Sequence, residues 1–178
     1  MEVNRQVLFK TISDNIKGLD KELESLNGSG IFFAPELYIA FLIGKEITRN
    51  KEIIFGSKDI VWDRERDLGN GGPSDIVFEN IRGEKSEITA VFEFKLRDTV
   101  DAYKKDINKL LLLNKPDCRK FFCVLLDSFS KANDDRLKNL EKEYSSQLKL
   151  IDKTSFPVNQ DWYRKQVYCI LNLYEVRA

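Results

Sequence analysis

The chain has 178 residues, which is enough for one domain with a substantial core. Its 29 Lys and Arg residues balance its 29 Asp and Glu residues, so the formal net charge of zero argues against coating nucleic acid through bulk attraction. The absence of histidine excludes Ser-His-Asp and Cys-His hydrolases, HNH-type nucleases and zincins, but it leaves chemistry by carboxylates and lysine open.

The lengths of the apolar runs and the spacing of the cysteines indicate the expected localisation and the expected lack of zinc and disulfides. No apolar run is long enough to span a bilayer, and no secretion signal is recognisable, so we expect a cytoplasmic protein without membrane contact. The three cysteines (Cys118, Cys123 and Cys169) form no CxxC pair, and we expect neither a zinc site nor a disulfide.

The first part of the chain is predicted to be mostly helical. Apolar residues recur at intervals of three and four from Val3 to Leu26, which predicts an amphipathic helix. A second helix is predicted from about Pro35 to Arg49, and Glu52 to Trp62 is interpreted as the first strand, with a bend near Gly56. The charged, glycine-rich segment from Asp63 to Pro73 is predicted to be a loop, either a mobile element beside an active site or an ordinary surface loop.

Two strands follow, joined by the turn Arg82-Gly83-Glu84-Lys85. A turn centred on Glu84 places Asp75 opposite Glu93, with Lys95 on the same face of the sheet. Two opposed carboxylates repel each other unless a positive group lies between them or one of them takes a proton. A bound Mg²⁺ ion would resolve this conflict, and the adjacent lysine suits charge developing on a substrate phosphate. The pattern therefore predicts metal-assisted hydrolysis of phosphodiester bonds.

An alternative interpretation of the second strand needs no active site. Phe92, Phe94 and Leu96 would face the core, while Glu93 and Lys95 faced water, as in any half-exposed antiparallel strand. In that case the three charged residues would form an ordinary surface ion pair.

The segments Pro73-Ser74-Asp75 and Glu93-Phe94-Lys95 resemble the signature of the PD-(D/E)xK nuclease-like (restriction endonuclease-like) superfamily, with one residue between the proline and the aspartate. The resemblance implies a hydrolase that cleaves DNA in restriction, phage defence or repair, with Mg²⁺ as cofactor and Mn²⁺ as a substitute. Asp75 and Glu93 would hold the metal and Lys95 would orient or activate water. The main-chain carbonyl of Phe94 is a further candidate metal ligand, because such oxygens suit hard cations.

Many members of this superfamily carry a glutamate on a helix ahead of the sheet, and Glu36 looks like that residue. Glu36 also has a structural explanation. Pro35 suits the first position of a helix, and an acidic residue near a helix N-terminus is favoured by the helix dipole. Both interpretations stay open.

A helix and a buried strand follow the motif. Thr99 is predicted to cap a helix that Asn114-Lys115-Pro116 ends, and Phe121 to Leu126 is an apolar run typical of a strand covered on both faces. A helix that joins two strands predicts a parallel crossover. We therefore expect an α/β fold in a single domain, residues 1–178: a mixed central sheet flanked by helices, with the αβββαβ core of the restriction endonuclease-like fold and an extra N-terminal helix.

The last part of the chain carries less chemistry. Asn133 to Lys149 is predicted to be an exposed helix, and Gln166 to Tyr174 a final strand. The region Ile151 to Arg164 between them contains Phe156, Pro157, Trp162 and Tyr163, whose aromatic rings either pack in the protein or stack on bases. A lysine-rich run is either a solvated helix face or a phosphate track; it comprises Lys104, Lys105, Lys109, Lys115, Arg119 and Lys120.

Two functional hypotheses result. The first is a Mg²⁺-dependent nuclease acting on DNA, and the second is a non-catalytic module that keeps the nuclease fold as a scaffold for nucleic acid or a protein partner. The long N-terminal helix either packs on its own domain or serves as the interface of a homodimer.

Overall fold

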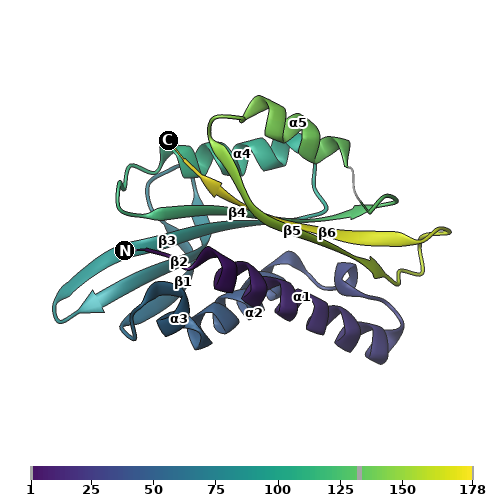
Figure 1. Ribbon diagram of the computed structural model, residues 1–178, viewed down its shortest axis with the longest axis horizontal. Helices are drawn as coiled ribbons and strands as arrows, with labels where there is room; N and C mark the ends of the chain where they lie inside the picture. Colours follow the sequence, from purple (N-terminus) through teal and green to yellow (C-terminus); the bar gives the residue numbers. More distant parts are fainter. Residues whose placement is uncertain (1, 132–133, 178) are drawn as a thin grey trace.

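The computed structural model describes residues 2–131 and 134–177. Within these residues, six strands form one mixed sheet in the order β1-β2-β3-β4-β6-β5. Helices α1, α2 and α3 cover one face of the sheet, and α4 and α5 cover the other (Figure 1). The elements in chain order are α1 Arg5–Asn27, the 3₁₀ turn η1 Ile31–Phe33, α2 Glu36–Arg49, α3 Lys51–Phe55, β1 Ile60–Asp67, β2 Pro73–Arg82, β3 Lys85–Leu96, α4 Val100–Leu112, β4 Arg119–Ser128, α5 Asp135–Glu143, β5 Leu148–Val158 and β6 Val167–Val176. The expected α/β class, with a mixed sheet between helices, is confirmed.

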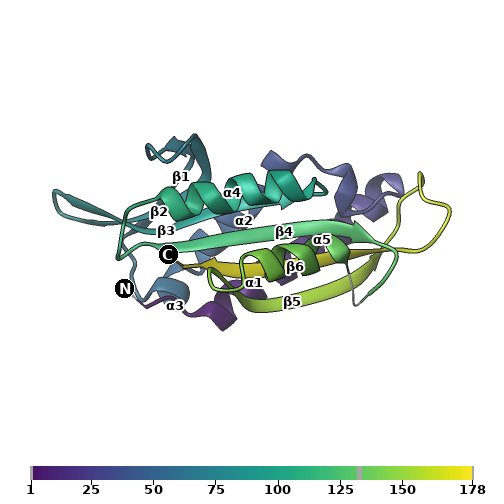
Figure 2. The same cartoon turned by 90° about the horizontal axis from the view of Figure 1, so that it is seen from above.

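The crossover between β3 and β4 has the predicted form. The two strands are parallel and α4 connects them, beginning after Thr99, whose side chain accepts a hydrogen bond from the N–H of Ala102. Residues Phe121 to Leu126 of β4 are at most 1% exposed, because helices lie over both faces of the central strands (Figure 2). The continuous apolar run is thus explained by burial on two sides.

The strand predicted from Glu52 to Trp62 is wrong in its first half. Residues Lys51–Phe55 form the short helix α3, which Gly56 ends with a left-handed φ of 67°, and β1 begins only at Ile60. Ile54 and Phe55 are buried in the core. An apolar run of this length is compatible with a helical turn as well as with a strand, so its pattern alone does not distinguish the two structures.

The loop predicted from Asp63 to Pro73 is also shorter than expected. Strand β1 continues to Asp67 and pairs antiparallel with β2, so only residues 68–72 connect them. The charged composition of β1 reflects its place at one edge of the sheet, where polar side chains face water.

Strand β5 was not predicted, since only its first two residues fall in the predicted helix and the region from Ile151 was assigned to no element. That helix was expected over Asn133 to Lys149. Asn133 lies outside the described residues, and α5 covers Asp135–Glu143. Strand β5 is the other edge of the sheet, where Pro157 is tolerated and where charged residues hide the alternating pattern.

The apolar stripe of α1 packs within its own domain. Leu8, Ile12, Ile16 and Leu19 are at most 4% exposed and belong to the core between the helices and the sheet. The three cysteines are free and buried. No helix among the described residues has the length and apolar character needed to cross a membrane.

Close packing between α2 and β1 depends on Gly44. A Cβ atom added there would lie 2.5 Å from the Trp62 ring, so a side chain would push the ring aside. We expect Gly44→Ala to lower the free energy of unfolding by about 1 to 3 kcal/mol, measured by urea denaturation. The control is Gly18→Ala, since Gly18 is an exposed helical glycine with open space around it, and this change is expected to stabilise by up to about 1 kcal/mol. Equal effects of the two changes would contradict the packing.

Candidate active site

The register of the β2–β3 hairpin brings the motif carboxylates to one face of the sheet. Ile76 pairs with Phe92 and Val77 with Val91, so the next residues outward, Asp75 and Glu93, lie across from each other. Val77 and Val91 belong to the core beneath α4. Because side chains alternate along a strand, Asp75, Glu93 and Lys95 lie on that same face.

A β-bulge produces this register. The turn is a two-residue loop between the paired residues Arg82 and Lys85, and Gly83 within it has a φ of 61°. A regular ladder from that turn would pair Asp75 with Phe92 and put it on the face of the phenylalanine. The register shift at Phe78/Glu79 leaves Thr89 unpaired in β3 and restores the alignment of Asp75 with Glu93. The turn is therefore centred between Gly83 and Glu84, half a residue before the predicted centre at Glu84. The bulge shifts the register back, so the predicted pairing of Asp75 with Glu93 is still formed.

Backbone hydrogen bonds fix two of the carboxylates. The N–H of Phe94 donates to Asp75 Oδ2 at 2.6 Å, and the N–H of Leu96 donates to Glu36 Oε2 at 2.7 Å. Glu36 is the first residue of α2, with Pro35 at the cap position rather than inside the helix. Glu36 thus occupies the helix N-terminus, as its structural explanation requires, and its carboxylate also reaches the end of β3.

Helix α4 contributes two charged residues that face the motif. Lys109 Nζ lies 2.5 Å from Glu93 Oε2 and donates to the carbonyl of Pro73 at 2.8 Å. Asp106 Oδ2 lies 3.2 Å from Lys95 Nζ, which is also 3.5 Å from Glu36 Oε1. The positive group that two opposed carboxylates require is therefore present as a lysine of the protein itself.

The pKa values reflect burial and crowding of like charges. Glu93 is 1% exposed; burial, together with the charge of Asp75, raises its pKa to about 8, although Lys109 opposes the rise. Burial also raises the pKa of Asp75, against the hydrogen bond from Phe94. Burial raises the pKa of Glu36 as well, against the hydrogen bond from Leu96.

Lys95 behaves in the opposite way. Burial lowers the pKa of its ammonium group, but the carboxylates of Asp106 and Glu36 outweigh burial and bring it to about 12. Lys95 is therefore a fixed positive charge near neutral pH. It suits stabilisation of a negative group and does not suit removal of a proton.

The oxygen donors at this site fit a hard divalent cation. Glu93 Oε1 is buried without a hydrogen-bond partner among the described residues, which leaves one acceptor of this carboxylate unused. Phe94 directs its N–H toward Asp75, and strand geometry directs its carbonyl to the same edge of β3. Over residues 2–131 and 134–177, no three His, Cys, Asp or Glu side chains converge enough to hold a metal by themselves. Mg²⁺ is commonly held by one or two carboxylates together with water and substrate phosphates.

The roles of Asp106 and Lys109 were missed in the sequence. Asp106 is 6% exposed and lies in the apolar stripe of α4 formed by Tyr103, Ile107 and Leu110. An acidic residue within such a stripe was the available signal, because a buried carboxylate needs a partner. Lys109 lies about one turn after Asp106 on the same helix, and the sequence analysis assigned it only to the lysine-rich run.

The lysine-rich run does not form a continuous track. Besides Lys109, which turns into the site, Lys104 Nζ lies 2.6 Å from Glu143 and Arg119 lies 3.7 Å from Glu175. Lys120 is 8% exposed. These four basic residues serve different local partners or are buried.

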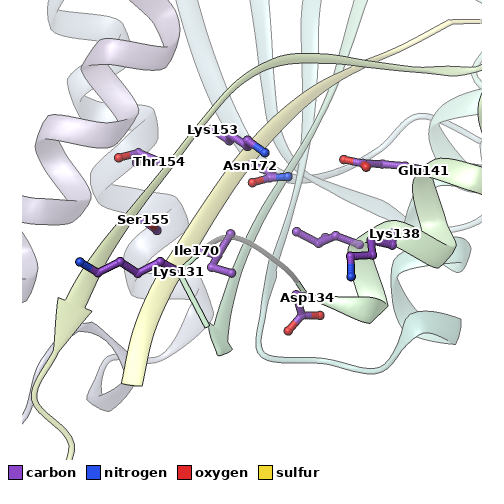
Figure 3. Close-up of a pocket in the computed structure, with 10 residues that line it drawn as sticks. Lys131, Asp134, Lys138, Glu141, Lys153, Thr154, Ser155, Ile170 and Asn172 are labelled. Carbon is purple, nitrogen blue, oxygen red and sulfur yellow. The ribbon is translucent and has the colours of Figure 1, made fainter. Parts of the chain in front are cut away.

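A separate cavity of about 380 Å³ lies between α5 and strands β5 and β6 (Figure 3). Lysine side chains and the buried Asn172 line it, and its lining includes none of the residues of the motif. The lining residues are Lys131, Asp134, Leu137, Lys138, Glu141, Lys153, Thr154, Ser155, Ile170 and Asn172. The opposed carboxylates at the end of β3 lie outside this cavity.

Comparison with known proteins gives no match for this chain: no family model, no curated protein and no solved structure is similar to it.

Proposed function

We propose that the protein is a Mg²⁺-dependent nuclease that hydrolyses phosphodiester bonds of DNA at the site built from Glu36, Asp75, Glu93 and Lys95. The observation that carries this proposal is the state of Glu93. Its carboxylate is almost completely buried beside a second carboxylate, and one of its oxygens has no partner among the described residues. Burying two acids together is costly, and such an arrangement is typical of functional sites.

The order of elements also supports the proposal. From α2 to β4 the chain runs helix, three strands, helix, strand, interrupted by the short α3. This is the order that the resemblance to the PD-(D/E)xK superfamily implies. The motif residues lie on the two central strands of that unit and at the start of its first helix.

Each residue has a role that follows from its contacts. Asp75, Glu93 and the carbonyl of Phe94 would hold the cation, which when bound supplies charge neutralisation at the phosphate and lowers the pKa of a water molecule. The Phe94 N–H orients the Asp75 carboxylate. Lys95, held between Glu36 and Asp106, presents a permanent positive charge to a phosphate oxygen.

The direct test is cleavage of plasmid, linear duplex and single-stranded DNA by the purified protein in Mg²⁺ or Mn²⁺, with a chelator as the control. Cleavage that depends on the metal supports the proposal. A folded protein that leaves every DNA form intact in both metals would rule it out.

A second candidate function is the non-catalytic scaffold, and one contact favours it. The ammonium group of Lys109 bonds Glu93 directly, so the protein neutralises its own buried acid without a metal. In a scaffold this contact between Lys109 and Glu93 would be permanent. In a nuclease the metal ion would have to replace Lys109 as the partner of Glu93.

Mn²⁺ titration by calorimetry separates the two functions. For a nuclease we expect the wild type to bind Mn²⁺ and Lys109→Met to bind it roughly tenfold more tightly, because the competing ammonium is gone. Glu93→Gln should lose binding. Lys105→Met is the control, since Lys105 is an exposed lysine on the same helix. Absence of binding in both the wild type and Lys109→Met would favour the scaffold.

A further inference from the structure

Arg97, two residues beyond Lys95, is held in an unusual conformation at the end of β3. Its φ is 50°, a left-handed value that is uncommon for a residue other than glycine. Its N–H donates to the carbonyl of Leu125 at 2.9 Å, and its Nη2 donates to the carbonyl of Phe32 at 3.1 Å. The backbone and the guanidinium group are therefore both fixed in place.

The guanidinium group of Arg97 lies against two aromatic rings. Its Cζ is 5.1 Å from the ring centre of Phe32 and 5.6 Å from that of Trp162. Within the described part of the chain, Arg97 forms no ion pair with a carboxylate, whereas the nearby Arg136 pairs with both Asp127 and Asp134. Arg97 is thus a positioned cation without an anionic partner among residues 2–131 and 134–177.

A row of aromatic rings continues from Trp162, exposed at Trp162 and Phe129 and half-buried at Tyr163 between them. Its ring centre is 6.2 Å from that of Tyr163, which is 5.6 Å from Phe129 in an edge-to-face arrangement. Tyr163 is anchored because its hydroxyl donates to the side chain of Asp127. Trp162 is 51% exposed and Phe129 is 63% exposed, although large apolar side chains are usually buried.

This aromatic row lies at the same end of the sheet as the proposed active site. Arg97 follows β3 and Phe129 follows β4, and these strands are parallel, so both end at this edge. Trp162 comes from the β5–β6 loop, which projects beyond the sheet at that end (Figure 2). Residues distant in sequence thus form one surface directly after Lys95.

We propose that Arg97, Trp162, Tyr163 and Phe129 bind unpaired nucleotides of DNA, and that the substrate of the site therefore carries a single-stranded segment. Bases have flat faces that stack on exposed aromatic rings in any sequence, and the Arg97 guanidinium group, which has no carboxylate partner among the described residues, matches a backbone phosphate. In duplex DNA the faces of each base are covered by the neighbouring bases, so aromatic side chains cannot stack on the bases of an intact duplex. This inference rests on the proposed nuclease function, because it names the substrate of that site.

The test uses the fluorescence of Trp162 in a Trp62→Phe background, which leaves one tryptophan, with a chelator present so that no cleavage occurs. Titration with a single-stranded oligothymidylate should quench the emission, and a duplex of the same length should do so much less. By anisotropy of a labelled oligothymidylate, Trp162→Ala and Arg97→Gly should each weaken binding roughly tenfold. Glycine is chosen at position 97 because it accepts the left-handed φ.

The matched control is Phe41→Ala. Phe41 is 40% exposed, packs 5.7 Å from Trp62 and has Arg64 5.6 Å from its ring, so it reproduces the aromatic and arginine chemistry on α2 and β1. This change should leave binding of the oligothymidylate unaltered.

Equal binding by the wild type and Trp162→Ala, or no quenching at all, would overturn the inference and leave contact with a protein as the use of the exposed rings. Binding of oligouridylate in preference to oligothymidylate would overturn it for DNA. Since the titration needs no metal, loss of this surface is distinguishable from failure of the nuclease itself. A protein that cuts plasmid DNA yet ignores single strands would refute only the inference.

Discussion

Asp75→Asn is expected to reduce metal-dependent DNA cleavage by roughly a thousandfold or more, while the protein stays folded. The amide oxygen of asparagine can accept the same hydrogen bond from the N–H of Phe94 that the carboxylate accepts. The substitution therefore removes the negative charge with little change in shape. Initial cleavage rates at saturating Mg²⁺, together with urea denaturation, measure the two effects separately.

The control for this change is Asp101→Asn, because Asp101 is an exposed acid in the first turn of α4. Its neutralisation should leave cleavage unaltered. Full activity of a folded Asp75→Asn protein would show that Asp75 is not a metal ligand, and it would contradict the proposed set of ligands.

Replacement of Lys95 would affect stability as well as catalysis. Its ammonium group is the partner of both Glu36 and Asp106, and Asp106 is buried. Lys95→Ala would leave that buried carboxylate without its cation, and loss of one member of a buried pair is strongly destabilising. Loss of activity in Lys95→Ala would therefore combine chemistry with unfolding.

The second large effect concerns Glu93 and pH. Its pKa is raised to about 8 in the folded protein against 4.5 ordinarily, mainly by burial. Between these two values the folded state retains a proton that the unfolded state has released, so Glu93 makes stability fall as pH rises from about 4.5 to 8. In the metal-free protein, Glu93→Gln should thus be more stable than the wild type at pH above 8, by roughly 3 to 5 kcal/mol. At a pH below 4.5 the two proteins should be equally stable.

Urea denaturation across this pH range, in a chelator, gives the comparison. The difference between the two proteins reports Glu93 together with its coupling to Asp75, whose charge is among the causes of the raised pKa, while the raised pKa of Glu36 acts in both. Glu87→Gln is the control, because Glu87 is an exposed glutamate on the same strand. A constant difference at every pH would contradict the raised pKa.

These two predictions describe one conflict within the site. A buried acid beside another acid is tolerable when it is protonated, when Lys109 bonds it, or when a cation does so. The metal-free structure uses Lys109. Its ammonium group ends a flexible side chain and is anchored otherwise by the carbonyl of Pro73, so release of Glu93 requires rotation of the Lys109 side chain.

The tertiary structure also explains why the aromatic residues of the β5–β6 loop remained ambiguous in the sequence. Trp162 and Tyr163 follow β5, whose charged edge-strand pattern was not recognised. Whether an aromatic residue is exposed depends on what covers it, and in this loop Trp162 is half exposed whereas Tyr163 packs partly against the core.

The sequence by itself determined the elements whose pattern repeats along the chain: the stripe of α1, the cap and stripe of α4, the apolar run of β4 and the two strands of the motif hairpin. Those patterns are local, because alternation and helical spacing report which side of an element is buried. Only the tertiary structure decided that a bulge at Thr89 aligns Asp75 with Glu93, and that α4 lies over β3 so that Lys109 meets Glu93. Both depend on how separate elements are placed against one another, and the spacing of residues within one element carries no record of that placement.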